Sequence, residues 1–251
     1  MEKIRLQKLF TDCGIMSRRA AEEEIRRGFV TVNGHVAEIG TKVDPVRDIV
    51  TYKGRRIQMP AKRDLVYIML NKPRGYATTL SDPHETKFVS DLLKDEVKAR
   101  VYPIGRLDKI SEGLLLLTND GELANRLTHP KHEIPKIYRV KVDGSVTDRQ
   151  LKDLTAEMDI DGYTIEPVEV TVHTVDDTST TLTFTLYEGR NRQIRKMCEQ
   201  VGLHIRRLNR IAIGKLKLGG LAVGKWRYLE PREVEYLYGH SNPNRRTGGK
   251  R

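Results

Sequence analysis

The chain has 251 residues, which is enough for one large domain or for a large and a small one. It carries 45 Lys+Arg against 34 Asp+Glu, and the net charge of +11 indicates an anionic partner. The first residues, MEKIRLQKLF, lack a long apolar run, and no stretch reaches membrane-spanning length, so neither secretion nor membrane insertion is expected. We expect a cytoplasmic protein with two buried thiols, Cys13 and Cys198, and no metal site.

The positive charge is unevenly distributed along the chain. Residues 1–60 carry 12 Lys+Arg and 8 Asp+Glu, residues 61–185 carry 17 and 21, and residues 186–215 carry 8 and 2. The middle is therefore acidic, and the cations are concentrated at the two ends and in one internal stretch. A merely solubilising surface mixes its signs more evenly, so the pattern favours contact with a polyanion.

The first sixty residues predict two short helices followed by a hairpin. Apolar residues at i, i+3, i+4 and i+7 form one helical stripe: Leu6, Leu9, Phe10 and Cys13. Ser17 is a good N-cap for a second helix. Asn33-Gly34 is the strongest short hairpin signal, and Lys53-Gly54 predicts another turn. These signals define a small domain over residues 1–60.

A larger mixed region follows a linker at residues 58–64. Its predicted strands are 66–70, 101–103, 114–117, 138–142, 168–173 and 180–186. One helix is expected from Asn119 or Asp120, and another from Asn191, which is placed to cap it.

Strands outnumber helices in this region, which favours an α+β fold. We expect a small N-terminal αα-hairpin domain (1–60) joined to a larger domain (61–238) with a mixed, mainly antiparallel sheet and flanking helices. Residues 239–251 lack apolar side chains other than proline and predict a basic, disordered tail.

The second helix of the small domain begins with Arg18 and Arg19. Charge alone fits a solvated helix face, helped by the acidic run Glu22–Glu24, as well as it fits a surface that contacts phosphates. The segment LQKLFTDCGIMSRRAAEEEIRRGFVTVNGHV, however, resembles the RNA-binding domain named after ribosomal small-subunit protein four. This resemblance implies that the domain binds structured RNA.

Three polar clusters adjoin predicted strands of the larger region. The first, residues 71–76, is more typical of a turn when taken alone. In the second, Gly105-Arg106-Leu107-Asp108 precedes four leucines, so Asp108 should be partly desolvated and need a cationic partner, with an ordinary ion pair to Arg106 as the alternative. In the third, residues 187–196, a strand runs into a helix whose first turn is expected to carry three arginines. These oppose the helix dipole, which favours anion binding over a solvated face.

Two further residues border these clusters. Arg195 follows the inward-facing Ile194, so it lies at the edge of the apolar helix face and can meet a buried carboxylate. Tyr138 lies on a predicted strand, where a tyrosine usually belongs to the core. Beside a nucleotide site it can stack on a base instead.

Three long segments occur in the order typical of one enzyme family: YPIGRLDKISEGLLLLTNDGELANRLTHP, KIYRVKV and LYEGRNRQIRKMCEQVGLHIRRLNRIAIGKLKLGGLAVGKWRYL. They resemble the RsuA/RluB family of rRNA pseudouridine synthases, over nearly the whole chain except the tail. The resemblance implies an isomerase that needs no metal and no cofactor. It also implies that Asp108 is the essential aspartate, Tyr138 the active-site tyrosine and Arg195 the partner of the aspartate.

The family's early Lys-Pro-x-Gly motif is matched by Lys72, Pro73 and Gly75. One departure, Lys109-Ile110-Ser111, stands beside the aspartate. The residues expected to hold RNA are Arg18, Arg19, Lys72, Arg106, Arg190 and Arg192.

The implied substrate is a uridine of a structured rRNA hairpin, which must turn out of its base stack to react. Large-subunit rRNA is the expected substrate, and the protein is expected to act as a monomer. Two alternatives are the same chemistry on small-subunit rRNA and a non-enzymatic RNA-binding or ribosome-assembly protein. The joint presence of Asp108, Tyr138 and Arg195 argues against the second of these. Asp108 can act as a nucleophile or as a base, and the sequence favours neither.

Overall fold

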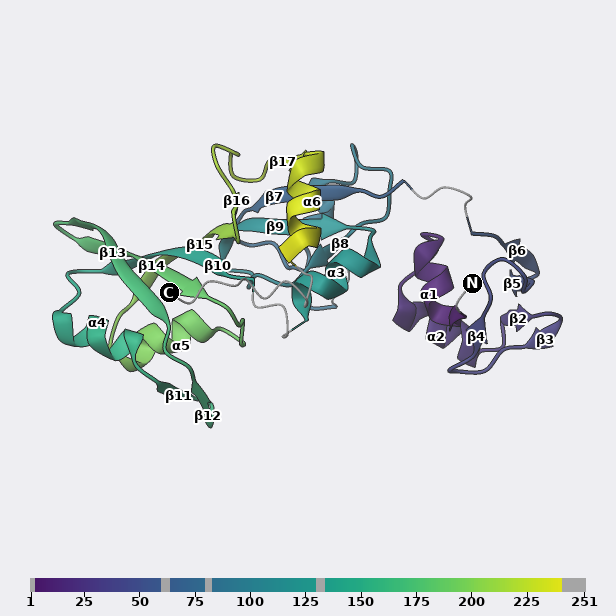
Figure 1. The fold of residues 1–251 in the computed structure, drawn as a ribbon, viewed down its shortest axis with the longest axis horizontal. Helices are drawn as coiled ribbons and strands as arrows, with labels where there is room; N and C mark the ends of the chain where they lie inside the picture. The colour runs from purple at the N-terminus through teal and green to yellow at the C-terminus, as the bar shows by residue number, and fades with distance from the viewer. Residues whose placement is uncertain (1–2, 60–63, 80–82, 130–133, 241–251) are drawn as a thin grey trace. The chain divides into compact units, whose positions relative to one another are not determined.

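The computed structural model describes residues 3–59, 64–79, 83–129 and 134–240 (Figure 1). Contacts divide the chain into two compact units, Met1–Leu65 and Val66–Arg251. Most of the linker expected at 58–64 and most of the tail expected at 239–251 lie outside the described residues. The last helix extends to His240, whereas the disordered tail was expected to begin at residue 239.

In its described residues, the N-terminal unit consists of two helices and short antiparallel strands. Its elements are β1 (Ile4–Arg5), α1 (Leu6–Asp12), α2 (Arg18–Arg26), β2 (Val30–Val32), β3 (His35–Val36), β4 (Lys42–Val43), β5 (Val50–Tyr52) and β6 (Arg55–Ile57). The strands pair in the order β3-β2-β5-β6, and β1 pairs with β4. Leu6, Leu9 and Phe10 of the predicted stripe are buried, and they form one core with Ala21 and Ile25 of α2.

Local signals in this unit act as the sequence predicts. The Ser17 hydroxyl accepts a hydrogen bond from the Ala20 N–H (3.2 Å) and caps α2. Between β2 and β3, Asn33 and Gly34 have φ of +52° and +86°, the left-handed pair that a two-residue hairpin turn requires. These signals determine where the short elements begin and end.

In the described part of the larger unit, nine strands form one sheet (Figure 1). They are β7 (Tyr67–Lys72), β8 (Tyr102–Ile104), β9 (Glu112–Thr118), β10 (Lys136–Asp143), β13 (Glu169–Asp176), β14 (Ser179–Leu186), β15 (Ile205–Ile213), β16 (Leu216–Lys217) and β17 (Trp226–Tyr228). The main order is β13-β14-β10-β15-β9-β7-β17, with β16 on β15 and β8 on β9. Among the described strands of this sheet, only β9 and β15 pair in parallel.

Helices and one hairpin flank the sheet. They are α3 (Gly121–Thr128), α4 (Asp148–Thr155), α5 (Gln193–Gln200), α6 (Pro231–His240), a 3₁₀ turn (Val89–Leu92) and the hairpin of β11 (Met158–Ile160) and β12 (Tyr163–Ile165). Asp120 is the N-cap of α3, where its carboxylate accepts from the Glu122 N–H (3.0 Å). The expected α+β fold with a mainly antiparallel sheet is confirmed.

The four leucines of β9 are buried because both faces of this strand are covered. Leu114 and Leu116 belong to a core with residues of α3 and α6, and Leu115 and Leu117 belong to a core with the 3₁₀ turn. A strand enclosed on both faces reads as a continuous apolar run rather than as an alternation. Strand β9 therefore gives rigid support to the loop between β8 and β9.

The prediction that Asn191 caps the α5 helix is wrong. The N-cap is Arg192, which has φ of +54° and makes no side-chain cap. Instead, Gln193 Oε1 accepts from the Arg190 N–H (3.1 Å) and turns the chain before the helix begins. Arg190 and Arg192 therefore precede the helix, and among the three expected arginines only Arg195 lies in its first turn.

Candidate active site

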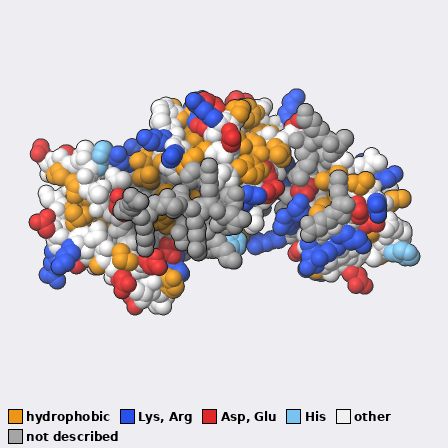
Figure 2. Space-filling model, viewed as in Figure 1, with side chains coloured by type: hydrophobic (Ala, Val, Ile, Leu, Met, Phe, Trp, Pro, Cys, Tyr) orange, Lys and Arg blue, Asp and Glu red, His pale blue; other side chains and the backbone are white. Residues whose placement is uncertain are grey.

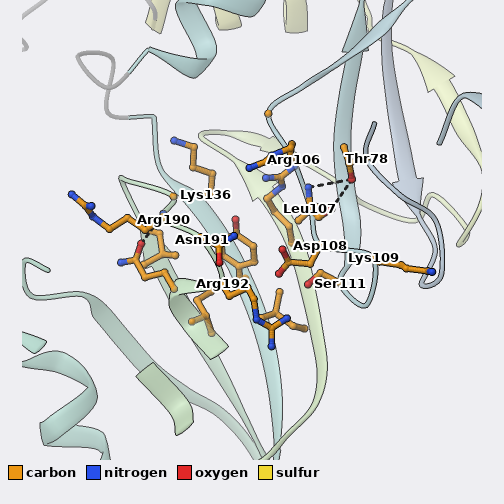
Figure 3. Close-up of a pocket in the computed structure, with 18 of the residues that line it drawn as sticks. Thr78, Arg106, Leu107, Asp108, Lys109, Ser111, Lys136, Arg190, Asn191 and Arg192 are labelled. Carbon is orange, nitrogen blue, oxygen red and sulfur yellow. Dashed lines mark hydrogen bonds between the residues drawn. The ribbon is translucent and has the colours of Figure 1, made fainter. Parts of the chain in front are cut away.

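A cavity of about 630 Å³ opens in the larger unit (Figure 3). It lies where the loop before β9, the first residues of β10 and the loop before α5 meet. Because β10, β15 and β9 are neighbours in the sheet, segments far apart in the sequence converge there. The segments that line the cavity include 77–79, 104–109, 136–138, 189–195 and 208–213.

Asp108 lies in the loop between β8 and β9. Gly105, with φ of +73°, turns the chain out of β8, and the Ser111 N–H donates to the Asp108 carbonyl oxygen (2.9 Å). The Thr78 hydroxyl donates to the Leu107 carbonyl oxygen (2.6 Å) and accepts from the Leu107 N–H (3.3 Å). The loop is thus held on both sides of Asp108, whose side chain is 38 % exposed and lines the cavity (Figure 3).

Lys72 is fully buried, so the expectation that it holds an RNA phosphate is wrong. Its ammonium donates to the carbonyl oxygens of Pro73 (3.1 Å), Asp108 (3.1 Å), Lys109 (3.3 Å) and Ser111 (2.9 Å). An ammonium has three N–H groups, so four acceptors occupy them all. Burial lowers the pKa of Lys72 to about 8. The residue fixes the backbone that carries Asp108.

The substitution Lys72→Met keeps the aliphatic length but removes every donor. We expect the free energy of unfolding to fall by about 3 kcal/mol, because several buried carbonyl oxygens lose their partners. Urea denaturation measures this change. As a control, Lys94→Met removes an exposed lysine whose ion pair with Asp91 is 3.5 Å long, and it should cost less than about 1 kcal/mol. Equal stabilities of the two variants would contradict the anchoring role.

Arg195 reaches the Asp108 loop from α5. Its Nε lies 4.0 Å from Asp108 Oδ2, and its Nη2 donates to the Ile110 carbonyl oxygen (3.3 Å) and to Ser111 Oγ (3.2 Å). Burial lowers the pKa of Arg195, whose side chain is 10 % exposed, but a guanidinium stays charged in proteins. The pair is held by charge rather than by a hydrogen bond, which leaves the carboxylate oxygens open to a substrate.

The alternative partner of Asp108 does not fill this role. Arg106 is exposed, and within the described residues the ion pair of Asp108 is made with Arg195.

Tyr138 projects from β10 into the same cavity. It stands opposite Phe184 of β14 on one side and Arg210 of β15 on the other. The residue is half-buried and contacts two of the hydrophobic cores. It therefore forms an aromatic wall of the cavity rather than a fully enclosed core side chain.

Three exposed arginines lie around the cavity: Arg106, Arg190 and Arg192 (Figure 3). Arg190 pairs with Glu188 (3.2 Å), and its guanidinium carbon lies 3.1 Å from the centre of the Tyr163 ring in β12. The β11–β12 hairpin thus supports the arginine loop. Within the described residues Arg106 and Arg192 form no ion pair, so their guanidinium groups remain open to an anionic ligand.

Arg18 and Arg19 belong to the N-terminal unit, where they are exposed at the start of α2. Figure 2 shows Lys and Arg side chains gathered on this unit. Other cations of α2 are paired, as Arg26 is with Glu23 (2.7 Å). Among the described residues, Arg18 and Arg19 form no ion pair with an acid, so their charge is available to phosphates.

Sequence reasoning gave no site role to four residues that line or brace the cavity: Thr78, Ser111, Lys136 and Arg210. Lys136 stands two residues before Tyr138 on one strand, and that spacing places both on the same face. Arg210 is in a strand whose arginines mask its apolar alternation. Thr78 acts through contacts with Leu107 that local patterns do not reveal.

The side chains that meet in the cavity are a carboxylate, an arginine and a tyrosine, with further cations around them. This set is suited to acid–base or nucleophilic chemistry on a nucleic acid. In the described parts of the chain, no group of three or more His, Cys, Asp or Glu is placed to hold a metal ion. None of the helices described is long and apolar enough to cross a membrane.

Comparison with known proteins defines the class of this enzyme. The sequence model described as RNA pseudouridylate synthase matches residues 66–200. The chain belongs to the RNA pseudouridylate synthase family, and it is an isomerase that forms pseudouridine in RNA. The expected membership of the RsuA/RluB group is confirmed.

Individual relatives agree with this assignment. The chain is 40 % identical over 240 residues to an uncharacterized RNA pseudouridine synthase of Aquifex aeolicus, covering 95 % of both. It is 41 % identical over 236 residues to ribosomal large subunit pseudouridine synthase B of Bacillus subtilis, covering 93 % of this chain and 95 % of the relative. A crystal structure of a pseudouridylate synthase matches with a TM-score of 0.65 and 26 % identity over 93 % of this chain and 99 % of the other.

Proposed function

We propose that this enzyme converts one uridine of large-subunit rRNA into pseudouridine, with Asp108 as the essential carboxylate. The observation that carries the proposal is the approach of Arg195 to Asp108, 4.0 Å apart, at a cavity of about 630 Å³. That volume suits a single nucleotide. The Bacillus subtilis relative named for the large subunit supports this choice of RNA.

The reaction breaks the N1–C1′ bond of uridine and joins C5 of the same base to C1′. Asp108 either attacks C1′ or removes a proton from the ribose, and both routes need an ionised carboxylate. Arg195 keeps this carboxylate charged and aimed. C5 then loses its proton and N1 takes one up, so substrate and product have the same composition.

The target uridine must leave its base stack to reach Asp108. Tyr138 stacks against the inserted uracil, and its hydroxyl assists removal of the C5 proton. Arg106, Arg190 and Arg192 hold the phosphates on either side of the flipped nucleotide. We further propose that the protein acts in the cytoplasm, and that it acts as a monomer because the RNA supplies the interface.

The N-terminal unit supplies a second contact with the RNA through Arg18 and Arg19. A second contact raises the effective concentration of the target hairpin at the cavity.

Replacing both arginines (Arg18→Ser with Arg19→Ser) should weaken RNA binding about tenfold. The slope of log affinity against log salt concentration should become less steep by about 1.5, because two phosphate contacts are lost. The rate on saturating RNA should stay unchanged. A matched control replaces Arg149 and Lys152, two exposed cations of α4 outside the cavity. If both double variants bind alike, the N-terminal contact is absent.

The substrate assignment is tested by mapping pseudouridines in rRNA from cells with and without this protein. We expect one large-subunit position to lose its pseudouridine when the protein is absent and to regain it when the wild-type chain is restored. Loss of a pseudouridine from small-subunit rRNA instead would show that the substrate is the small-subunit rRNA. Unchanged maps of both RNAs would contradict a role in rRNA.

A further inference from the structure

Two cations that line the cavity have no role in the chemistry described so far. Arg210 of β15 is 5 % exposed. Lys136 of β10 is half-buried and lines the same cavity (Figure 3). Arg210 stands directly opposite Tyr138 in the pairing of β10 with β15, and Lys136 and Tyr138 share one face of β10. Both cations therefore lie beside the aromatic wall of the cavity.

Arg210 is held in place, but not all of its hydrogen-bond donors have an acceptor. Its Nε donates to the Leu114 carbonyl oxygen (2.7 Å), while its buried Nη2 has no hydrogen-bond acceptor among the described residues. The β15 backbone approaches β9 very closely here, since a Cβ on Gly113 would lie 2.3 Å from the Arg210 carbonyl oxygen. The backbone that carries Arg210 is therefore fixed against β9.

Lys136 adds a second positive charge. Its ammonium donates to the Tyr187 carbonyl oxygen (3.1 Å), and within the described residues no carboxylate forms an ion pair with it or with Arg210. Burial, and then the charge of Arg210, lowers the pKa of Lys136. A buried guanidinium beside a half-buried ammonium, without an acid, is costly, so the site favours an anion from outside the protein.

We propose that Arg210, assisted by Lys136, receives the oxygens of the target uracil and stabilises the negative charge of the base after its bond to the ribose breaks. This inference rests on the proposed function, since it needs the target nucleotide at Asp108. When the N1–C1′ bond breaks, its electron pair stays on N1 and spreads to O2 and O4. Both routes for Asp108 produce this uracil anion. The charge is neutralised when C5 bonds to C1′, after which C5 loses its proton and N1 takes one up.

The position of Arg210 favours the base over a phosphate. The RNA backbone carries its charge on the outside of the nucleotide, where the exposed Arg106, Arg190 and Arg192 lie. Arg210 is buried and stands opposite Tyr138, the proposed stacking partner of the uracil. Fixed donors in a site that excludes water stabilise developing charge strongly, because they need no reorganisation during the reaction.

The test compares two RNAs, a large-subunit transcript made with uridine and the same transcript made with 5-fluorouridine. Fluorine at C5 withdraws electrons and stabilises the base anion by itself. Arg210→Met should slow N1–C1′ cleavage about 100-fold on the uridine RNA at saturation, a typical loss for one such donor, but only about tenfold on the fluorinated RNA. Lys136→Met should act in the same direction with a smaller effect. RNA affinity should be unchanged in both.

Several variants separate this role from simple damage to the fold. Lys141→Met, on the same strand and paired with Asp176 outside the cavity, should retain the wild-type rate on both RNAs. Arg210→Lys, which keeps the charge, should be faster than Arg210→Met. Thermal denaturation shows whether each variant is folded. If Arg210→Met does not fold, the rates of Lys136→Met on the two RNAs test the inference instead.

Three outcomes have distinct meanings. An equal loss of rate on both RNAs would overturn the inference and leave a structural role. A loss of affinity instead of rate would also overturn it and make the pair a phosphate site. A wild-type protein that leaves both transcripts unmodified would refute the proposed substrate itself, before any variant is compared.

Discussion

The variant Asp108→Asn is expected to form pseudouridine about 10⁴-fold more slowly than the wild type, or not at all. Asparagine has the size of aspartate, but it can neither attack C1′ nor accept a ribose proton. The loop should keep its shape, because Lys72 and Ser111 hold it through the backbone of residue 108. Single-turnover formation of pseudouridine measures the loss, and filter binding should give an RNA affinity within about threefold of wild type.

A matched control is Asp177→Asn, which changes an exposed acid in the turn between β13 and β14. It should retain the full rate. Product formation by Asp108→Asn at a near wild-type rate would remove Asp108 from the mechanism.

The second large effect is expected at Arg195. Arg195→Met removes the charge 4.0 Å from Asp108 and the donors to the Ile110 carbonyl oxygen and to Ser111 Oγ. We expect the rate on saturating RNA to fall about 100-fold, since the carboxylate loses both its pairing and its aim. Arg195→Lys keeps the charge without the planar fork, so its rate should lie between those of wild type and Arg195→Met.

The kinetic pattern distinguishes this role from RNA binding. A residue that positions the carboxylate should change kcat and leave KM nearly constant. Arg149→Met, an exposed change on α4, is the control and should have no effect. A raised KM with unchanged kcat in Arg195→Met would make Arg195 a phosphate contact instead.

Much of the fold could be predicted because local patterns determine it. The run Leu114–Leu117 predicts a buried strand, Ser17 and Asp120 cap helices, and Asn33-Gly34 forms the expected left-handed turn. Strand β15 was missed, because Arg206, Arg207 and Arg210 interrupt its apolar alternation. Its place between β10 and β9 depends on pairing with distant strands, which no local pattern encodes.

The candidate site was predicted in part. Local patterns singled out Asp108, Tyr138 and Arg195, the resemblance implied their roles, and the structure places them around one cavity. Lys72, which matches the family's Lys-Pro-x-Gly motif, was expected to hold RNA. Its burial under the Asp108 loop depends on carbonyl oxygens nearly forty residues away, which only the tertiary fold brings together.

The most direct test of the central claim is tritium release from large-subunit rRNA labelled at C5 of uridine. Joining C5 to C1′ expels the C5 hydrogen, so release reports the isomerisation itself. The wild-type protein should release tritium in step with pseudouridine formation, and Asp108→Asn should release none above background. Release by Asp108→Asn at the wild-type rate, or none by the wild-type protein, would contradict the account.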